Sequence, residues 1–331
     1  MKEDDEILNE IRVYLGAGPR EKKQTRRNML LLTAVCLVLA YFALYIGGSR
    51  RFEAGFYRVE TGKLKEPIRV VGLTDLHNAQ FGEGNEKLIS RIRDLNPDII
   101  LIAGDMVTAG NEDIETAVSL CEKLTAVAPV FYSYGNHENK MVYGSDLTPS
   151  FLEENEEWLY GDDGGHADFG KIPMKDSALP DALSETGVIL LNNNTEQIRI
   201  GEDIIDLAGI NSESGAYYPY SSRMMEEFLS GDTGNLKIII AHRPTVSTVI
   251  ESQGWLHYDL LFSGHTHGGL IRIPGLGGMF RSGRLWPLFT GMDAGMSKNS
   301  QGTMILGRGL GNSNFVPRIF NLPELIVADI S

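Results

Sequence analysis

The sequence predicts a layered α/β domain that follows a single membrane-spanning helix. Three observations support this prediction. From Ile68 onward, short runs of β-branched and aliphatic residues alternate with amphipathic stretches, as in folds whose buried strands are covered by helices. A long uncharged apolar run lies near the N-terminus. Polar residues follow the end of nearly every predicted core strand.

The composition allows a substantial core and excludes several classes of protein. The chain has 331 residues, 42% hydrophobic and 22% charged, which suits one large domain with an appendage. The net charge is −14; because a nucleic-acid groove needs a basic stripe, we expect no nucleic-acid partner. Two cysteines, Cys36 and Cys121, cannot form a disulfide framework or a cysteine zinc cluster. Any metal must therefore be bound by His, Asp, Glu or Asn.

The N-terminal apolar run has the length of a membrane span. Residues 28–49 carry no charge, and about 20 apolar residues cross a hydrocarbon core of roughly 30 Å. A buried core helix would show a polar face over this length. A signal peptide would have a shorter apolar region followed by a small-residue cleavage site. We interpret the run as an uncleaved anchor and keep a cleaved signal peptide as the alternative.

Basic residues flank this span asymmetrically, with five at positions 20–27 just before it and two directly after it. The positive-inside rule therefore places residues 1–27 in the cytoplasm as a short tail. Residues 28–49 form the transmembrane anchor and 50–66 a linker. The large domain, residues 67–331, is expected outside the cytoplasm, at the cell membrane.

Ten apolar runs in the large domain are predicted strands. Five have the near-continuous aliphatic content of core strands, and five more make a second sheet plausible. The first group comprises residues 68–75, 98–105, 129–136, 236–242 and 258–265, and the second comprises 188–191, 197–200, 204–208, 303–307 and 325–330. Stretches at 86–95 and 112–126 have helical spacing. Residues 144–176 are acidic, glycine-rich and weakly periodic, which predicts an inserted loop or cap.

Residue types that bind metals follow five of the predicted strands. They are Asp75 and His77, then Asp105, then Asn136 and His137, then His242, and finally His265 and His267. Five of the seven histidines lie at these strand ends. Because the carboxyl ends of strands in layered α/β folds share one edge, residues far apart in sequence converge there. The spacings Asp-x-His and His-x-His place both side chains on one side of an extended segment, where both can reach one ion.

The residue types predict a metal site built from nitrogen and oxygen ligands. Without a thiolate, the set suits manganese, iron or zinc in five- or six-coordinate geometry more than a closed tetrahedral zinc site. Asp105 is the expected bridge between two ions, since a carboxylate has two oxygens. Each pattern alone is weak, because Gly-Asp and Gly-Asn are common turn dipeptides. Their occurrence in this order, each at a strand end, is what indicates a site.

Taken together, these residues resemble the signature of the calcineurin-like metallophosphoesterase superfamily. The ordered motifs D-x-H, G-D, G-N-H-[ED], H and G-H-x-H are all matched between residues 68 and 269. Segments 308–312 and 323–325 are similar to the C-terminal end of its membrane-linked bacterial branch. That branch includes UDP-2,3-diacylglucosamine pyrophosphatases and cell-envelope phosphoesterases. The resemblance implies a four-layer α/β/β/α sandwich.

The resemblance also implies a role for each position. One ion would be bound by Asp75, His77 and His267, a second by Asn136, His242 and His265, and Asp105 would bridge them. His137 is not a ligand in this pattern; it protonates the leaving group or steadies the phosphoryl oxygens. Leu270 and Thr108 depart from the commonest pattern, which bears on the substrate rather than on the chemistry.

The implied activity is that of a metal-dependent phosphoesterase with two divalent cations. Manganese is the expected metal, with iron or zinc as alternatives. Two such ions lower the pKa of a shared water, and the resulting metal-bridging hydroxide would attack phosphorus in line with the leaving oxygen. We expect a membrane-anchored phosphohydrolase that cleaves phosphodiester or pyrophosphate bonds, on a lipid or other phosphorylated small molecule of the cell envelope, including glycoconjugates. No protein partner is implied.

Two other classes of function remain open at this point. One is a phosphomonoesterase, such as a nucleotidase or a protein phosphatase. The other is a non-catalytic, metal-stabilised binding protein, although such a protein would be expected to have lost a ligand or His137, and all are present.

Two further features bear on the substrate. Arg243 directly follows His242 and could contact a substrate phosphate through two N–H groups, although a solvated or Asp-paired arginine fits equally. Residues 271–289 mix arginines with bulky apolar residues. This mixture predicts either contact with anionic headgroups or a β-hairpin packed on the core. His166 and His257 are expected to take no part in the chemistry.

Overall fold

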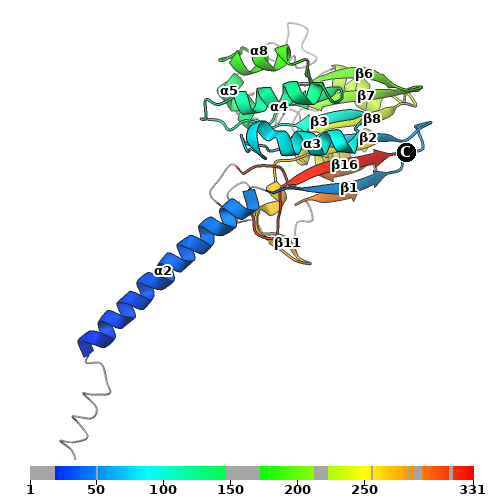
Figure 1. Ribbon diagram of the computed structural model, residues 1–331. Coiled ribbons are helices and arrows are strands. Elements are labelled where there is room, and N and C mark those ends of the chain that lie inside the picture. Colours follow the sequence, from blue (N-terminus) through cyan, green and yellow to red (C-terminus); the bar gives the residue numbers. More distant parts are fainter. Residues whose placement is uncertain are drawn as a thin grey trace, which may run out of the picture. The chain divides into compact units, whose positions relative to one another are not determined.

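Two six-stranded sheets form the large unit of the chain (Figure 1). In spatial order, the first sheet contains β1 (Glu53–Val59), β16 (Glu324–Ile330), β2 (Ile68–Leu73), β3 (Ile99–Ala103), β4 (Val130–Ser133) and β5 (Ile189–Leu190). The second contains β14 (Gly295–Lys298), β15 (Thr303–Leu306), β9 (Leu260–Ser263), β8 (Leu236–Ala241), β7 (Asp203–Ile210) and β6 (Asn194–Ile200). All ten predicted strands are present, but their division between the sheets differs from the sequence interpretation.

The computed structural model describes residues 19–49, 51–145, 172–211, 223–254, 256–281, 284–285, 293–312 and 316–331. Within these ranges, the side chains at 19–25, 44–49, 223–226, 253, 280–281 and 284–285 are not described. Most of the predicted insert 144–176 and His166 therefore lie outside the described residues. The chain divides into two compact units, Met1–Gly47 and Gly48–Ser331, and each is described by itself.

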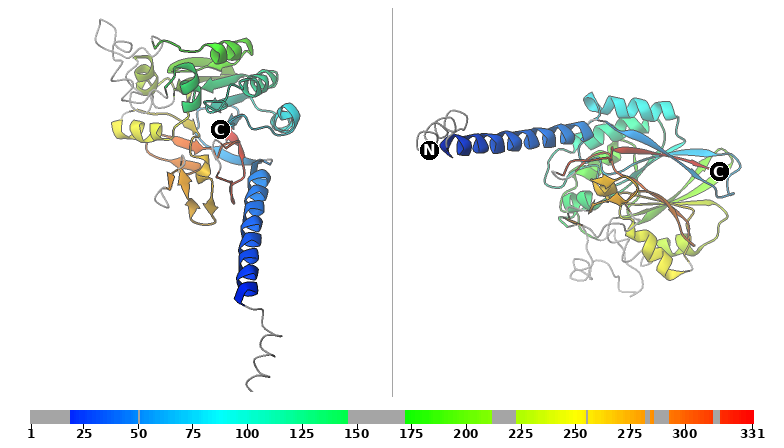
Figure 2. Two further views of the ribbon diagram at one scale, coloured as in Figure 1. Left: turned by 90° about the vertical axis from the view of Figure 1, so that its left-hand side faces the viewer. Right: turned by 90° about the horizontal axis from the view of Figure 1, so that it is seen from below.

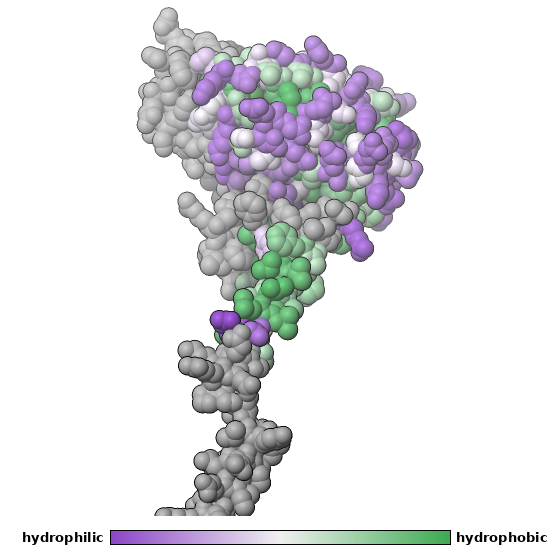
Figure 3. Space-filling view, turned by 60° about the vertical axis from the view of Figure 1, so that its left-hand side comes forward, coloured by the Kyte–Doolittle hydropathy of each residue, from purple (hydrophilic) through white to green (hydrophobic). Residues whose placement is uncertain are grey.

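The N-terminal unit contains helix α2, Pro19–Ser49. Its stretch Arg26–Ala43 has a mean hydropathy of 1.4, and none of it is buried. Figure 3 shows most of this described stretch as a hydrophobic surface, with hydrophilic atoms at its lower end. By length and composition alone, α2 is able to cross a membrane.

The central strands are buried on both faces, as their unbroken aliphatic sequences predict. Successive residues of a strand point to opposite faces. In β3, Leu101 packs between the two sheets, whereas Ile100 and Ile102 pack on the outer face of the first sheet. In β8, Ile238 lies between the sheets and Ile239 lies on the outer face of the second. Each sheet thus has one apolar face toward its partner and one toward helices.

Helices cover both outer faces. On the first sheet these are α3 (Glu86–Leu95), α4 (Glu115–Thr125) and α8 (Ala178–Glu185), and on the second α10 (Arg223–Ser230) and α11 (Thr245–Gln253). Figure 2 shows the sheets face to face between these helices, with α3 in cyan, α4 in blue-green and α11 in yellow. The architecture is a four-layer α/β/β/α sandwich, which confirms the predicted fold class.

Sheet membership corrects the sequence interpretation at two places. Strands β8 and β9, grouped with the first core strands by their composition, belong to the second sheet, and β5 and β16 belong to the first. Strand β1 lies within the range 50–66 that we predicted as a linker, and that prediction is wrong for Glu53–Val59. This strand pairs in parallel with β16, at the other end of the chain. Its sequence EAGFYRV has no apolar run, so only the distant partner identifies it as a strand.

Strand direction determines where the polar residues gather. Strands β2, β3, β4 and β5 are mutually parallel, as are β7, β8, β9 and β15. The segments after the carboxyl ends of β2, β3, β4, β8 and β9 meet at one edge of the sandwich, where Asp75 hydrogen-bonds His265 and Asp105 contacts His242. This edge is where the sequence places its candidate site residues.

Candidate metal centre

Backbone hydrogen bonds join the loop after β2 to the loop after β3. The N–H of Asp75 donates to the carbonyl of Gly104 at 3.0 Å, and the N–H of His77 donates to the carbonyl of Asp105 at 3.0 Å. The two loops therefore have fixed positions relative to one another, and so do the side chains that they carry.

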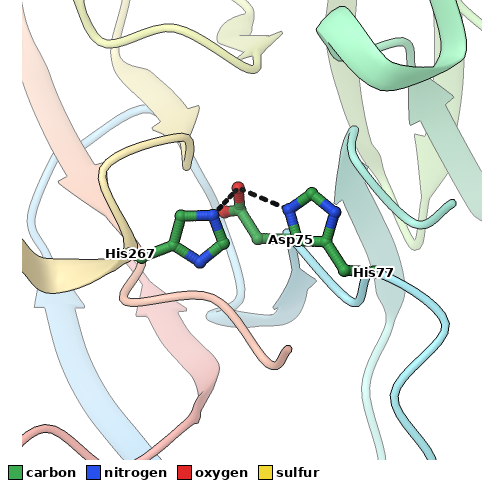
Figure 4. A group of neighbouring side chains, drawn as sticks. All are labelled: Asp75, His77 and His267. Carbon is green, nitrogen blue, oxygen red and sulfur yellow. Dashed lines mark ion pairs between the residues drawn. The ribbon is translucent and has the colours of Figure 1, made fainter. Parts of the chain in front are cut away.

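Asp75, His77 and His267 form the first cluster (Figure 4). The carboxylate oxygen Oδ1 of Asp75 lies 3.5 Å from Nε2 of His267 and 4.0 Å from Nε2 of His77. Both imidazoles point at the same carboxylate (Figure 4). Thr74 and the backbone N–H of His265 also donate to this carboxylate, which fixes its orientation.

Asp105 lies between the first cluster and a second one. Its Oδ2 atom is 3.8 Å from Nε2 of His77 and 3.1 Å from Nε2 of His242. Potential ligand atoms of Asp105, His242 and His265 form a group within 4.8 Å, and those of Asp105, His77 and His137 form another. One carboxylate thus contacts both sides of the centre.

The second cluster also contains His265, and Asn136 follows β4 at the same edge of the sandwich. Nδ1 of His265 lies 3.1 Å from Nε2 of His242. Asn136 begins helix α5, Asn136–Val142, directly after β4, and its side chain is buried. The structure therefore brings all seven predicted ligand positions to one edge of the sandwich, together with His137.

Several of these residues have strained backbone conformations. Asp75, His77, Asp105, His265 and His267 all have positive φ, between 46° and 73°. Non-glycine residues seldom adopt this region, although Asp, Asn and His do so more than others. Strain of this kind concentrates where a site needs a particular side-chain placement.

Two glycines allow the close packing around the carboxylates. A Cβ atom at Gly135 would lie 2.2 Å from Oδ1 of Asp105, and one at Gly264 would lie 2.4 Å from Oδ2 of Asp75. Any side chain at either position would displace a carboxylate. The glycines of the G-N-H and G-H-x-H motifs therefore have a steric reason to be there.

The donor set fits divalent cations. Nε2 of His77 and Oδ1 of Asn136 are buried and have no hydrogen-bond partner, although buried polar atoms are nearly always paired. A cation at each cluster would satisfy them. Burial lowers the pKa of His77, His265 and His267, which favours the neutral imidazole that binds metals.

Asp105 and His242 titrate as a close pair. Burial alone would raise the pKa of Asp105, but the adjacent His242 holds it well below its usual range. Burial alone would lower the pKa of His242, and Asp105 raises it instead to about 9. The carboxylate is thus kept ionised, which is the state that binds a cation.

His242 and His137 are held in opposite tautomers. Nδ1 of His242 lies 2.8 Å from the carbonyl oxygen of Ala103, so Nδ1 carries a proton and donates it there. Nδ1 of His137 instead accepts a hydrogen bond from the backbone N–H of Ala109 at 2.8 Å. The proton of a neutral His137 is therefore on Nε2, which lies 3.9 Å from Oδ2 of Asp105. In its neutral form His242 offers a lone pair at Nε2, whereas neutral His137 offers a proton there.

Arg243 lies at the second cluster. Its Nη1 atom is 3.0 Å from Nε2 of His265. Thr108, at a position where the sequence departs from the common motif, lies with its hydroxyl 3.4 Å from Nδ1 of His77. His257 is exposed and lies outside the clusters.

Glu138 is a buried carboxylate whose role the sequence analysis did not identify. Its oxygens accept backbone N–H groups of Asp105 at 2.8 Å and Met106 at 2.7 Å. They also accept the N–H of Gly135 at 2.9 Å and the hydroxyl of Tyr132 at 2.6 Å. Glu138 thus joins the loop of Asp105 to the loop of Asn136. The signal was available, since Glu138 directly follows His137 in the motif.

Arg318 was missed entirely by the sequence analysis. It is buried, and its guanidinium donates to the carbonyls of Gly311 and Arg308. Its Nη2 atom lies 3.4 Å from Nδ1 of His267. The N–H of Gly311 in turn donates to the carbonyl of Asp75 at 2.6 Å. A lone arginine in a segment without periodicity gives no sequence signal for this role.

The segment 271–289 contains short hairpins. Arg272–Ile273 (β10) pairs with Gly277–Gly278 (β11), and Phe280–Arg281 (β12) pairs with Arg284–Leu285 (β13). The side chains of residues 280–289, on which the membrane-contact hypothesis depends, lie outside the described residues.

Comparisons with known proteins agree with this geometry. Residues 68–269 match the calcineurin-like phosphoesterase family. An uncharacterized metallophosphoesterase of Campylobacter jejuni is 25% identical over 77% of this chain and 59% of its own length. Phosphodiesterase YaeI of Escherichia coli is 26% identical over 65% of this chain and 66% of its own length. A transmembrane protein with metallophosphoesterase domain from Danio rerio is 24% identical over 74% of this chain and 51% of its own length. The chain thus spans about half to two thirds of the length of these relatives.

Proposed function

Because this chain belongs to the calcineurin-like phosphoesterase family, we propose that it is a membrane-anchored phosphohydrolase that cleaves phosphodiester or pyrophosphate bonds in lipids or glycoconjugates of the cell envelope. The coarser statement rests on the family: the chain is a metal-dependent phosphoesterase whose clustered Asp and His residues are able to hold two metal ions. The observation that carries the proposal is the position of Asp105, whose carboxylate contacts histidines of both clusters.

The proposed ligand set follows the clusters. Asp75, His77 and His267 would hold one ion, Asn136, His242 and His265 the other, and Asp105 would bridge the two. Manganese is the proposed metal, with iron and zinc as alternatives, because nitrogen and oxygen donors suit all three. The two unpartnered buried atoms, Nε2 of His77 and Oδ1 of Asn136, support one ion at each cluster.

The proposed mechanism also needs a proton donor to the leaving group. Two bound cations supply an ionised water and neutralise charge on the phosphoryl group. His137 is the proposed proton donor to the leaving oxygen, because its Nδ1 is occupied by Ala109 and its Nε2 faces the centre. Its side chain is 19% exposed, whereas those of His77 and His242 are fully buried. It is therefore placed to meet a substrate that arrives from solvent.

Arg243 is the proposed second contact to the substrate phosphate. Its guanidinium lies beside His265 at the second cluster, and its side chain is not fully buried. A guanidinium can donate two parallel hydrogen bonds to phosphate oxygens. We assign it to orient the phosphoryl group.

The lipid part of the proposal rests on the N-terminal helix. Helix α2 has the length and composition of a membrane span, and a relative from Danio rerio carries the name of a transmembrane protein. The basic residues before the span would place residues 1–27 in the cytoplasm and the catalytic unit outside it. An anchored enzyme would meet substrates that are themselves held in the envelope.

Hydrolysis of two chromogenic substrates by the full-length protein in detergent tests the activity. Turnover of bis(p-nitrophenyl) phosphate and of p-nitrophenyl phosphate would be measured with added Mn²⁺, Fe²⁺ or Zn²⁺, and with EDTA. We expect metal-dependent cleavage, faster for the diester, that Asp105→Asn abolishes. Faster cleavage of the monoester would favour a phosphomonoesterase. No turnover by a folded, metal-loaded protein on these substrates or on envelope lipid extracts would favour a binding role and refute the proposal.

Protease protection in intact cells and in inverted membrane vesicles tests the location. Protease added to the extracytoplasmic side of intact cells should digest the catalytic unit. Inverted vesicles expose the cytoplasmic face of the membrane, so in them the unit should be protected. Extraction of the protein by alkaline carbonate, or digestion of the unit only from the cytoplasmic side, would contradict the proposed anchor and orientation respectively.

A further inference from the structure

A buried carboxylate on the last strand of the chain has no role in the centre described above. Glu324 is the first residue of β16, and its side chain is 3% exposed. Its Oε2 atom accepts hydrogen bonds from Nε of Arg308 at 3.0 Å and from the backbone N–H of Arg308 at 3.2 Å. Its Oε1 atom accepts the hydroxyl of Tyr57, on β1, at 2.9 Å. Three segments of the chain therefore meet at one carboxylate.

Glu324 holds the segment 308–311, which follows β15 and lies against the loop of Asp75. Besides the two contacts to residue 308, the backbone N–H of Glu324 donates to the carbonyl of Gly309 at 3.0 Å. The N–H of Gly311 donates to the carbonyl of Asp75 at 2.6 Å. The segment is thus bound to Glu324 on one side and to the backbone of a proposed metal ligand on the other.

The side chain of Arg308 also packs on the loop that carries His267. A Cβ atom at Gly268 would lie 2.7 Å from Cγ of Arg308, so the arginine already fills the space beside the residue after His267. The carbonyl of Arg308 accepts Nη2 of Arg318 at 2.8 Å, and the same Nη2 atom lies 3.4 Å from Nδ1 of His267. Arg308 therefore contacts the surroundings of a second ligand of the first cluster.

The second cluster does not share this support. Within the described part of the chain, the hydrogen bonds and ion pairs of Glu324 and Arg308 reach no residue of that cluster. The other carboxylate paired with Arg308 is that of Glu53, at the start of β1. His242 is held instead by the carbonyl of Ala103. A change at Glu324 should therefore act on the first cluster more than on the second.

We infer that Glu324 is a positioning residue for the first cluster. Through segment 308–311 it holds the loops of Asp75 and His267 in the arrangement that binds a cation. Tyr57 makes β1, the first strand of the catalytic unit, part of the same support. The inference rests on the proposed two-ion centre, and it concerns the affinity for one of the two ions rather than the chemical step.

A two-step titration of the full-length, metal-free protein with Mn²⁺ tests the inference. Glu324→Gln removes the negative charge but can keep a contact to each partner, because its amide accepts through one atom and donates through the other and the hydroxyl of Tyr57 can accept. The matched control is Asp206→Asn. Asp206 is another buried carboxylate, on β7, and it is hydrogen-bonded by Thr233 and Asn235 away from both clusters.

In Glu324→Gln, one of the two binding steps should weaken by about 10–100-fold, the range for contacts that orient metal ligands, while the other step is retained. Excess Mn²⁺ should restore the wild-type kcat for bis(p-nitrophenyl) phosphate, because Glu324 is buried and meets no substrate. Asp206→Asn should leave both steps unchanged even where it lowers the melting temperature. Tyr57→Phe, which keeps the ion pair and removes one hydrogen bond, should weaken the same step by about threefold.

The outcomes separate this inference from the function on which it rests. Two unchanged steps in Glu324→Gln, or equal weakening of both steps in Glu324→Gln and in Asp206→Asn, would show that Glu324 supports only the fold. If Glu324→Gln does not fold, an unchanged titration of Tyr57→Phe would refute the inference. If wild-type protein binds two ions, Glu324→Gln loses one and neither hydrolyses a p-nitrophenyl substrate, the hydrolase proposal fails and the inference holds. Wild-type protein that binds no ion would refute both.

Discussion

The backbone N–H of Ala109 donates a 2.8 Å hydrogen bond to Nδ1 of His137. This contact leaves the proton of the neutral imidazole on Nε2, toward the carboxylate of Asp105. A neutral imidazole protonated at Nε2 has no lone pair there for a metal. The contact therefore distinguishes His137 from the six neighbouring His and Asp residues that are proposed as metal ligands.

Replacement of His137 by Gln should reduce kcat by about 10²–10⁴-fold without loss of metal, because general acid catalysis contributes this much. The loss should be smallest for leaving groups of low pKa, which depart without a proton. The measurement is kcat for a series of aryl phosphodiesters, with metal content determined by mass spectrometry. His257→Gln, at an exposed histidine outside the clusters, is the control. A parallel loss of metal would show that His137 is a ligand instead.

Substitution of Asp105 should remove more bound metal from the protein than substitution of Asp75. Asp105→Asn should lower the bound metal from two equivalents toward none, since Asp105 contacts both clusters. Asp75→Asn should remove one equivalent, since Asp75 belongs to the first cluster alone. Metal content after dialysis measures both, with Asp94→Asn on exposed helix surface as the control. Equal losses for the two variants would argue against Asp105 as the bridge.

The sequence predicted the central strands well because their residues are buried on both faces and therefore form unbroken apolar runs. Leu101 and Ile102, for example, face opposite layers of the sandwich. The assignment of β8 and β9 to the second sheet could not be predicted, because their composition matches that of β2 and β3. Strand β1 was missed because its pairing with β16 joins the two ends of the catalytic unit.

The candidate site was predictable for a different reason. Each predicted ligand position follows a strand within one to four residues, so strand direction alone brings these positions together. The residues that hold the loops were harder to recognise. Glu138 accepts hydrogen bonds from the backbone N–H groups of Asp105 and Met106. Nearly every residue has a backbone N–H, so the residue types at 105 and 106 give no sign of this contact.

Glu138→Gln should destabilise the protein and weaken metal binding together. The carboxylate of Glu138 accepts backbone N–H groups at both of its oxygens. In glutamine one oxygen is replaced by an NH₂ group, which cannot accept a hydrogen bond, so at least one buried N–H would lose its acceptor. We expect the free energy of unfolding of the metal-free protein to fall by about 3 kcal/mol, measured by urea denaturation. Glu122→Gln, on exposed surface, should have no effect. Unchanged stability would mean that the carboxylate does not hold the Asp105 loop.

Arg318→Lys should weaken one metal site selectively. The guanidinium binds the carbonyls of Arg308 and Gly311, and the N–H of Gly311 binds the carbonyl of Asp75. A lysine keeps the positive charge but lacks the planar fork that spans two acceptors. Supporting contacts of this kind typically change metal affinity by about 10–100-fold, so the loss should fall on the cluster of Asp75 and His267.

A two-step metal titration of the full-length protein, followed by competition with a chelator, distinguishes this from general destabilisation. In Arg318→Lys, one of the two binding steps should weaken by at least about tenfold while the other is retained. Arg91→Lys, at an exposed position of α3, should leave both steps unchanged. If both steps weakened equally, or if the melting temperature fell with no change in either affinity, Arg318 would support the fold as a whole and not the first cluster. Selective loss of one step would instead show that the end of the chain holds a ligand loop that begins at residue 75.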